Sequence, residues 1–170
     1  DLWDPSAGLA SGHVTIENRT GVDVYCGSQL LSSGGDLLIA GGDNWSGQQT
    51  SNTGNRNTVV YSDGVLTRGT DMLRARWCPS GTTLANGDIY IQGGRGDGDR
   101  PEVRGAGGSF RLLSAVDTST LEPLAPRNFL AADGRVFGFD ATGAMYFVDT
   151  TGAGSRVAAG HLPQAVAGST

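Results

Sequence analysis

Lysine is absent from this chain of 170 residues, and all 12 basic residues are arginines scattered between Arg19 and Arg156. The formal net charge is −5. A dispersed basic set on an acidic chain argues against nucleic acid or an anionic membrane as the main partner. Long apolar runs are also missing, since stretches such as Asp36–Ala40 fall far short of the roughly 20 residues that cross a bilayer. The sequence therefore predicts neither nucleic-acid binding nor a membrane span.

Cysteine and histidine are almost as scarce, with two of each: Cys26, Cys78, His13 and His161. Two cysteines are too few for a disulfide-scaffolded mini-protein and fit one bridge or two buried thiols equally well. A metal site with two or more nitrogen donors close together is not indicated by these two histidines, which share no ligand motif. A nucleophile elbow, a phosphate loop, a zinc spacing and a dinucleotide fingerprint are all missing.

Glycine, in contrast, is abundant at 28 residues and lacks the triplet period of collagen. Glycines in this number are typical of turns between many short strands. With 38% hydrophobic and 17% charged residues, the composition fits one globular domain. The sequence therefore predicts an all-β protein without a helix of useful length.

A polar turn followed by a short β-rich run occurs three times, at Ser33–Gly42, Ala85–Gly94 and Ala132–Asp140. The turn glycines Gly35, Gly87 and Gly134 lie 52 and 47 residues apart. A period near 50 with a glycine pair after an apolar strand resembles the kelch repeat, in which each unit is a four-stranded antiparallel β-propeller blade. We therefore expect residues 1–170 to form one partial propeller domain with blades at about 9–73, 74–124 and 125–165. Because propellers have about four to eight blades, the ring is incomplete unless the chain self-associates.

Two polar stretches, 44–57 and 95–108, are long for hairpin loops and are expected to be connections that either bind a ligand or form the rim of the ring. Trp45 lies in the first of them and is the best candidate for stacking on a sugar. For Trp77, core packing is the expected role.

Five segments together resemble the early propeller blades of galactose and glyoxal oxidases: Asp1–Pro5, Arg76–Ser80, Thr83–Asp88, Pro126–Leu130 and Asp133–Phe137. The resemblance implies a secreted copper radical oxidase, which oxidises an alcohol or aldehyde with oxygen and releases hydrogen peroxide. The cofactor of that family is a thioether between a cysteine and a copper-ligating tyrosine. Cys26 matches the cysteine of this cofactor.

The family places its copper-ligating tyrosine where this chain has Cys78, directly after Ala75–Trp77. A thiol cannot form the delocalised phenoxyl radical on which that chemistry depends, so no catalytic residue is assigned. A second departure is Ala125, since relatives often have an aromatic residue before Pro-Arg-Asn. The other copper ligands of the family lie in later blades, so no metal ligand and no cofactor are expected in this chain alone. Copper belongs to the resembled family.

The same resemblance implies that Cys26 and Cys78 are neighbours, because the family joins these positions covalently. A disulfide and a pair of buried free thiols both remain open.

The leading interpretation is a segment or altered form of a copper radical oxidase that is inactive alone. The alternative is a non-catalytic kelch binding or assembly module that completes its propeller by self-association. A third possibility is an active enzyme whose partner chain supplies the later blades. The expected partners are a second copy, the missing blades, a carbohydrate, or a small alcohol or aldehyde, and the resemblance implies an extracellular location.

Overall fold

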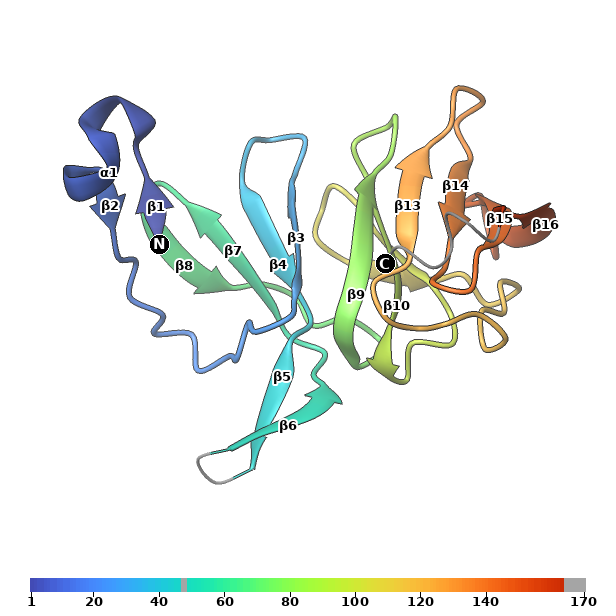
Figure 1. Cartoon of the computed structure of the whole chain (residues 1–170), viewed down its shortest axis with the longest axis horizontal. Helices are drawn as coiled ribbons and strands as arrows, with labels where there is room; N and C mark the ends of the chain where they lie inside the picture. Colours follow the sequence, from blue (N-terminus) through green and yellow to red (C-terminus); the bar gives the residue numbers. More distant parts are fainter. Residues whose placement is uncertain (47–48, 164–170) are drawn as a thin grey trace.

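The computed structural model describes residues 1–46 and 49–163. Three four-stranded antiparallel sheets stand side by side and are accompanied by two small two-stranded sheets (Figure 1). The predicted all-β fold class is therefore confirmed. The sheets do not close into a barrel, which is consistent with an incomplete propeller.

The first large sheet has the strand order β3 (Ser28–Leu31), β4 (Leu37–Ala40), β7 (Thr58–Ser62) and β8 (Val65–Arg68). The second sheet consists of β9 (Arg76–Thr83), β10 (Ile89–Gly96), β11 (Glu102–Arg104) and β12 (Phe110–Leu112). The third consists of β13 (Arg127–Leu130), β14 (Val136–Phe139), β15 (Ala144–Asp149) and β16 (Ser155–His161). Strands that follow one another in these sheets pair antiparallel.

A hairpin of β1 (Leu2–Trp3) and β2 (His13–Val14) lies at the start of the chain, and its connection holds the 3-10 turn η1 (Pro5–Ala7) and the one-turn helix α1 (Gly8–Ser11). A second hairpin, β5 (Asp43–Ser46) with β6 (Gln49–Gly54), projects from the first large sheet (Figure 1).

The expectation that residues 44–57 and 95–108 are loops is wrong in part. The first stretch contains most of the β5–β6 hairpin, in which polar side chains bond to the opposite strand. The Asn44 side chain donates to the Gly54 carbonyl at 2.7 Å, and the Asp43 carboxylate accepts from the Thr53 amide at 3.2 Å. The second stretch contains β11. The polar composition of these two stretches therefore did not show that they lack strands.

The repeated turns share one backbone conformation. Gly35, Gly87 and Gly134 have φ values of 91°, 85° and 86°, a region that side chains with a Cβ rarely adopt. Each glycine amide donates back to the carbonyl three residues earlier, at 3.0, 2.9 and 3.0 Å. These turns join the first two strands of each large sheet, which explains the spacing of the sequence repeat.

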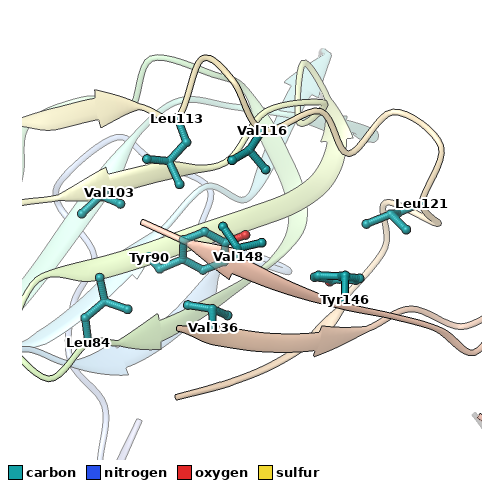
Figure 2. Close-up of a cluster of buried hydrophobic side chains, with 9 residues drawn as sticks. All are labelled: Leu84, Tyr90, Val103, Leu113, Val116, Leu121, Val136, Tyr146 and Val148. Carbon is teal, nitrogen blue, oxygen red and sulfur yellow. The ribbon is translucent and has the colours of Figure 1, made fainter. Parts of the chain in front are cut away.

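The core lies between the sheets, because alternate residues of each strand point to opposite faces. Leu38 and Ala40 of the first sheet pack against Ile89 and Ile91 of the second. A larger cluster fills the space between the second and third sheets (Figure 2). It contains Leu84, Tyr90, Val103, Leu113, Val116, Leu121, Val136, Tyr146 and Val148. Burial of these two layers holds the three sheets together.

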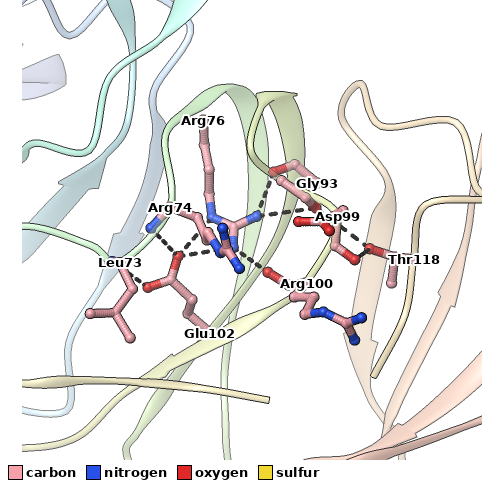
Figure 3. Close-up of polar contacts among 9 residues, drawn as sticks. Leu73, Arg74, Arg76, Gly93, Asp99, Arg100, Glu102 and Thr118 are labelled. Carbon is pink, nitrogen blue, oxygen red and sulfur yellow. Dashed lines mark hydrogen bonds and ion pairs between the residues drawn. The ribbon is translucent and has the colours of Figure 1, made fainter. Parts of the chain in front are cut away.

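A buried ion pair ties the entry of β9 to the next two strands (Figure 3). The side chains of Arg76 and Glu102 are both 0% exposed, with Nη2 and Oε1 3.0 Å apart. Glu102 also accepts from the amides of Leu73 at 2.6 Å and Arg74 at 2.9 Å. Arg76 donates to the Gly93 carbonyl at 2.7 Å. Burial lowers the pKa of the Arg76 guanidinium, and the charge of Glu102 opposes this shift.

We predict that Glu102→Gln lowers the free energy of unfolding by about 3–5 kcal/mol, because it leaves a buried guanidinium without its counter-charge. Urea denaturation at neutral pH measures this loss. The matched control is Asp71→Asn, which breaks the exposed pair with Arg68 (2.7 Å, side chains 43% and 42% exposed). That change should cost less than about 1 kcal/mol. Equal losses in the two variants would show that the buried pair has no special weight.

Candidate functional site

The site indicated by the sequence lies where the first strands of the three large sheets meet. One residue with a positive φ lies before or near the start of each of these strands. These residues are Cys26 (59°) before β3, Cys78 (56°) in β9 and Ala125 (46°) before β13. Non-glycine residues seldom adopt this conformation and need support from neighbouring groups. Backbone hydrogen bonds supply that support, since the Cys78 amide donates to the Cys26 carbonyl at 2.8 Å and the Ala125 amide donates to the Cys78 carbonyl at 2.9 Å. The three residues therefore form a backbone ladder from sheet to sheet.

Cys26 and Cys78 are joined by a disulfide in the first step of this ladder, with their Cα atoms 4.7 Å apart. Of the two states left open by the sequence, the structure has the bridge. Both residues are partly exposed, and the bond links the segment before β3 to β9 across 52 residues of sequence. A disulfide sulfur has no proton to transfer and no thiolate to offer a metal, so the pair as it stands is neither a base nor a ligand.

Beside the disulfide, Trp77 forms a stacked pair with an arginine. The Arg95 guanidinium carbon lies 5.1 Å from the centroid of the Trp77 ring, and the two residues face each other in the register of β9 and β10. Gly94, the residue before Arg95 in β10, has a φ of 89°, and a Cβ there would lie 2.8 Å from the Cβ of Arg76. The glycine is therefore required for the close approach of these two strands. The expected core role of Trp77 is met only in part, because its side chain is partly exposed.

An open hollow of about 520 Å³ lies along the first strands of all three sheets. Its lining combines apolar residues such as Pro79, Pro126 and Phe129 with the hydroxyls of Ser28 and Ser80 and the amides of Gln29 and Asn128. Among the described residues that line the hollow, Arg127 is charged and the others are neutral. Such a surface offers hydrogen bonds to a neutral polar ligand but has no carboxylate or imidazole to act as a general base.

The donor set does not fit a copper centre. His13 Nδ1 lies 2.7 Å from a carboxylate oxygen of Asp1, beside the β1–β2 hairpin, whereas His161 ends β16 in the third sheet. Both thiols are consumed in the disulfide. Within residues 1–46 and 49–163, no three His, Cys, Asp or Glu side chains gather into a group that could hold a metal ion.

Trp45, the candidate for stacking on a sugar, belongs to β5, but its side chain lies outside the part of the chain that the structure describes. Its role stays a prediction.

Sequence reasoning missed a hydrogen-bonded chain between the second and third sheets. The Tyr90 hydroxyl donates to Gln92 Oε1 at 2.5 Å, Gln92 Nε2 donates to the Tyr146 hydroxyl at 2.8 Å, and Tyr146 donates to Asn128 at 3.2 Å. Burial raises the pKa of Tyr90 well above its ordinary value and raises the pKa of Tyr146 to about 12. Tyr90 and Gln92 are two residues apart in a strand, which places them on one face and indicates that they can bond to each other. The residues that extend this hydrogen-bonded chain, Tyr146 and Asn128, lie in another repeat, so the sequence does not indicate them.

Comparison with the models of known protein families finds no match, and comparison with the curated proteins finds none either. Among solved structures, the chain is similar to a fungal alcohol oxidase of the AA5 family in complex with copper, with a TM-score of 0.71 and 20% identity. The match covers 84% of this chain but only 31% of that chain. At this identity the likeness establishes the fold. In the described residues, no helix is long and apolar enough to cross a membrane.

We predict that replacing both cysteines, Cys26→Ala with Cys78→Ala, lowers the free energy of unfolding by about 2–4 kcal/mol, because the bridge closes a long loop in the unfolded chain. Urea denaturation measures the loss, and the wild type in dithiothreitol should match the double variant. As a control, thiol titration of the denatured wild type should detect no free thiol before reduction. Unchanged stability together with two titratable thiols would contradict the bond.

We predict a second effect above pH 10. Tyr146 has its pKa raised from 10.0 to about 12 by burial, so the folded chain keeps a proton that the unfolded chain has lost between these values. Stability is therefore complete below pH 10 and falls as the pH rises toward 12. Urea denaturation from pH 9 to 12 should give a shallower fall for Tyr146→Phe, by on the order of 2 kcal/mol at the end of the series. Tyr25→Phe, at a residue that is 62% exposed, should leave the slope unchanged.

Proposed function

We propose that the chain is an altered segment of a galactose oxidase-like copper oxidase propeller, in which a disulfide has taken the position of the radical cofactor and which does not oxidise alcohols by itself. The observation that carries this proposal is the Cys26–Cys78 bond. It lies at the two positions that resemble the cysteine and tyrosine of the family's thioether. The pair is therefore still a covalent link between neighbouring sheets, but without a phenol that can be oxidised to a radical.

Three further observations support the proposal. The fold is similar to that of a fungal AA5 alcohol oxidase in complex with copper, of which this chain spans 31%. The histidines lie in separate hairpins and sheets, and the described residues offer no metal-binding group. The hollow along the first strands has no acid–base residue in its described lining. In this proposal the large sheets are kelch-type blades.

A secreted location belongs to the same proposal. Disulfides form and persist in oxidising compartments and are rare in the cytosol. The bond between Cys26 and Cys78 supports this location.

A second function, a non-catalytic assembly module, is favoured by one observation. Within residues 1–46 and 49–163, one face of the third sheet packs against the second sheet, and its other face carries partly exposed aromatic side chains such as Phe129. An exposed apolar face of this kind marks an interaction surface.

We predict that the purified chain, incubated with copper(II), produces no peroxide above the copper-only blank with galactose, glyoxal or benzyl alcohol. A peroxidase-coupled assay measures the product, and galactose oxidase in the same assay is the positive control. The reason is the replacement of the radical-forming phenol by Cys78. Peroxide formation that requires both copper and substrate, and that is lost in Cys26→Ala, would overturn the proposal.

A further inference from the structure

A second hollow lies where the β5–β6 hairpin leaves the first large sheet and passes the entry of β9 (Figure 1). Its volume is about 370 Å³, and all of its lining comes from residues 44–97. Five of the lining residues belong to the polar stretch 44–57, and Asp97 belongs to the polar stretch 95–108. Both stretches that the sequence indicated as connections therefore contribute to one hollow, which we call the side hollow.

Gly54 allows the two stretches to meet. It is buried at the end of β6, and a Cβ there would lie 2.5 Å from the Arg95 carbonyl oxygen. A larger residue would push β6 away from the end of β10. On the other side, the Asp97 amide donates to the Ala75 carbonyl at 3.0 Å. Backbone contacts therefore fix the position of both stretches around the side hollow.

The amide nitrogens of the lining side chains are already used. Asn44 Nδ2 donates to the Gly54 carbonyl at 2.7 Å, and Asn57 Nδ2 donates to the Asp71 carboxylate at 3.2 Å. The Asn55 side chain is buried and donates to two backbone carbonyls, at 3.0 and 2.7 Å. Because each nitrogen lies against an acceptor, these bonds also fix which end of each amide is the oxygen. The lining is held in place before a ligand arrives.

The groups that remain for a ligand are mostly acceptors. Within residues 1–46 and 49–163, no hydrogen bond reaches Asn57 Oδ1, Asp71 Oδ2 or the carboxylate of Asp97. Among the same residues, the exposed Arg56 guanidinium has no ion pair, and it supplies donors to the hollow. A ligand that fits this lining has to donate several hydrogen bonds and accept others from a guanidinium.

The charges of the side hollow nearly balance. Asp71 already pairs with Arg68 at 2.7 Å, and Asp97 and Arg56 carry opposite charges. A charged ligand therefore gains little net Coulomb attraction from the lining. Apart from glycine, two lining residues are apolar, so an apolar ligand gains little from burial. A neutral compound with several hydroxyls meets these conditions, because each hydroxyl donates one hydrogen bond and can accept others.

We propose that the side hollow binds a neutral polyhydroxyl compound, such as one sugar unit, without transforming it. Hydroxyls of the ligand donate to Asp97 and Asn57, and another accepts from Arg56. In the described chain, this site shares no lining residue with the hollow along the first strands. The inference goes beyond the proposed function and does not depend on whether the protein oxidises alcohols.

An NMR titration of the nitrogen-labelled chain tests the proposal, with glucose and galactose as neutral probes and glucuronate as the charged one. We expect the neutral probes to shift the amide signals of Gly54, Asn57 and Asp97. Asp97→Ala should weaken their binding by about tenfold, because it removes a charged acceptor. The matched control is Asp36→Ala in the turn between β3 and β4, a carboxylate outside the lining. It should leave the dissociation constant unchanged.

A second variant, Arg56→Ala, should also weaken binding by about tenfold, because it removes the guanidinium donor. Arg56 and Asp97 are exposed, so both variants should keep the circular dichroism spectrum and the melting temperature of the wild type. The proposal is overturned by absent shifts with both neutral probes, by shifts centred on Ser80 and Asn128, or by an equal loss in Asp36→Ala. Glucuronate binding as tight as that of glucose would overturn the neutral ligand class.

The peroxide assay is independent of these outcomes. Peroxide formation would overturn the proposed function and leave the sugar site in place, whereas a chain that is inactive and binds neither neutral probe would do the reverse.

Discussion

A sheet that is apolar on both faces has to be covered on both sides, and this constraint governs the whole molecule. The second sheet meets it by lying between its two neighbours, with Ile89 and Ile91 turned to one side and Tyr90 and Val103 to the other. The first sheet meets it with a neighbour and with the segment around Val22. Only one face of the third sheet is covered within the described chain. The buried Arg76–Glu102 pair keeps the middle sheet in register, because it fixes the entry of β9 against β10 and β11.

Under the proposed function, the Cys26–Cys78 bond links two sheets and takes no part in oxidation chemistry. A covalent link between the first two sheets is present whether the partner of the cysteine is a phenol or a second thiol. Only the phenol adds redox chemistry. The backbone ladder explains why the two side chains meet at all, since Cys78 donates its amide to Cys26 with both residues in the left-handed conformation. Ala125 repeats this geometry without a side chain that could extend the link.

Much of the fold could be read from local sequence, because turn glycines impose a conformation that other residues avoid. Gly35, Gly87 and Gly134 therefore located three sheets correctly. Polar composition failed at β5–β6, since side chains such as Asn44 satisfy the opposite backbone and stabilise a hairpin without an apolar face. Neither the left-handed backbone conformation of the two cysteines nor the hydrogen bonds that link Tyr90 to Tyr146 could be derived from the sequence, because both depend on contacts between repeats. The pairing of Cys26 with Cys78 was open for the same reason.

The order of strands in each large sheet follows the order of the sequence, in the ranges 28–68, 76–112 and 127–161. Strand pairing is therefore local, and each sheet can complete its hydrogen bonds before the next one leaves the ribosome. The long-range steps are the stacking of finished sheets and the closure of the disulfide. A chain built in this way can gain or lose a whole sheet by duplication or deletion of one contiguous gene segment without rethreading the rest.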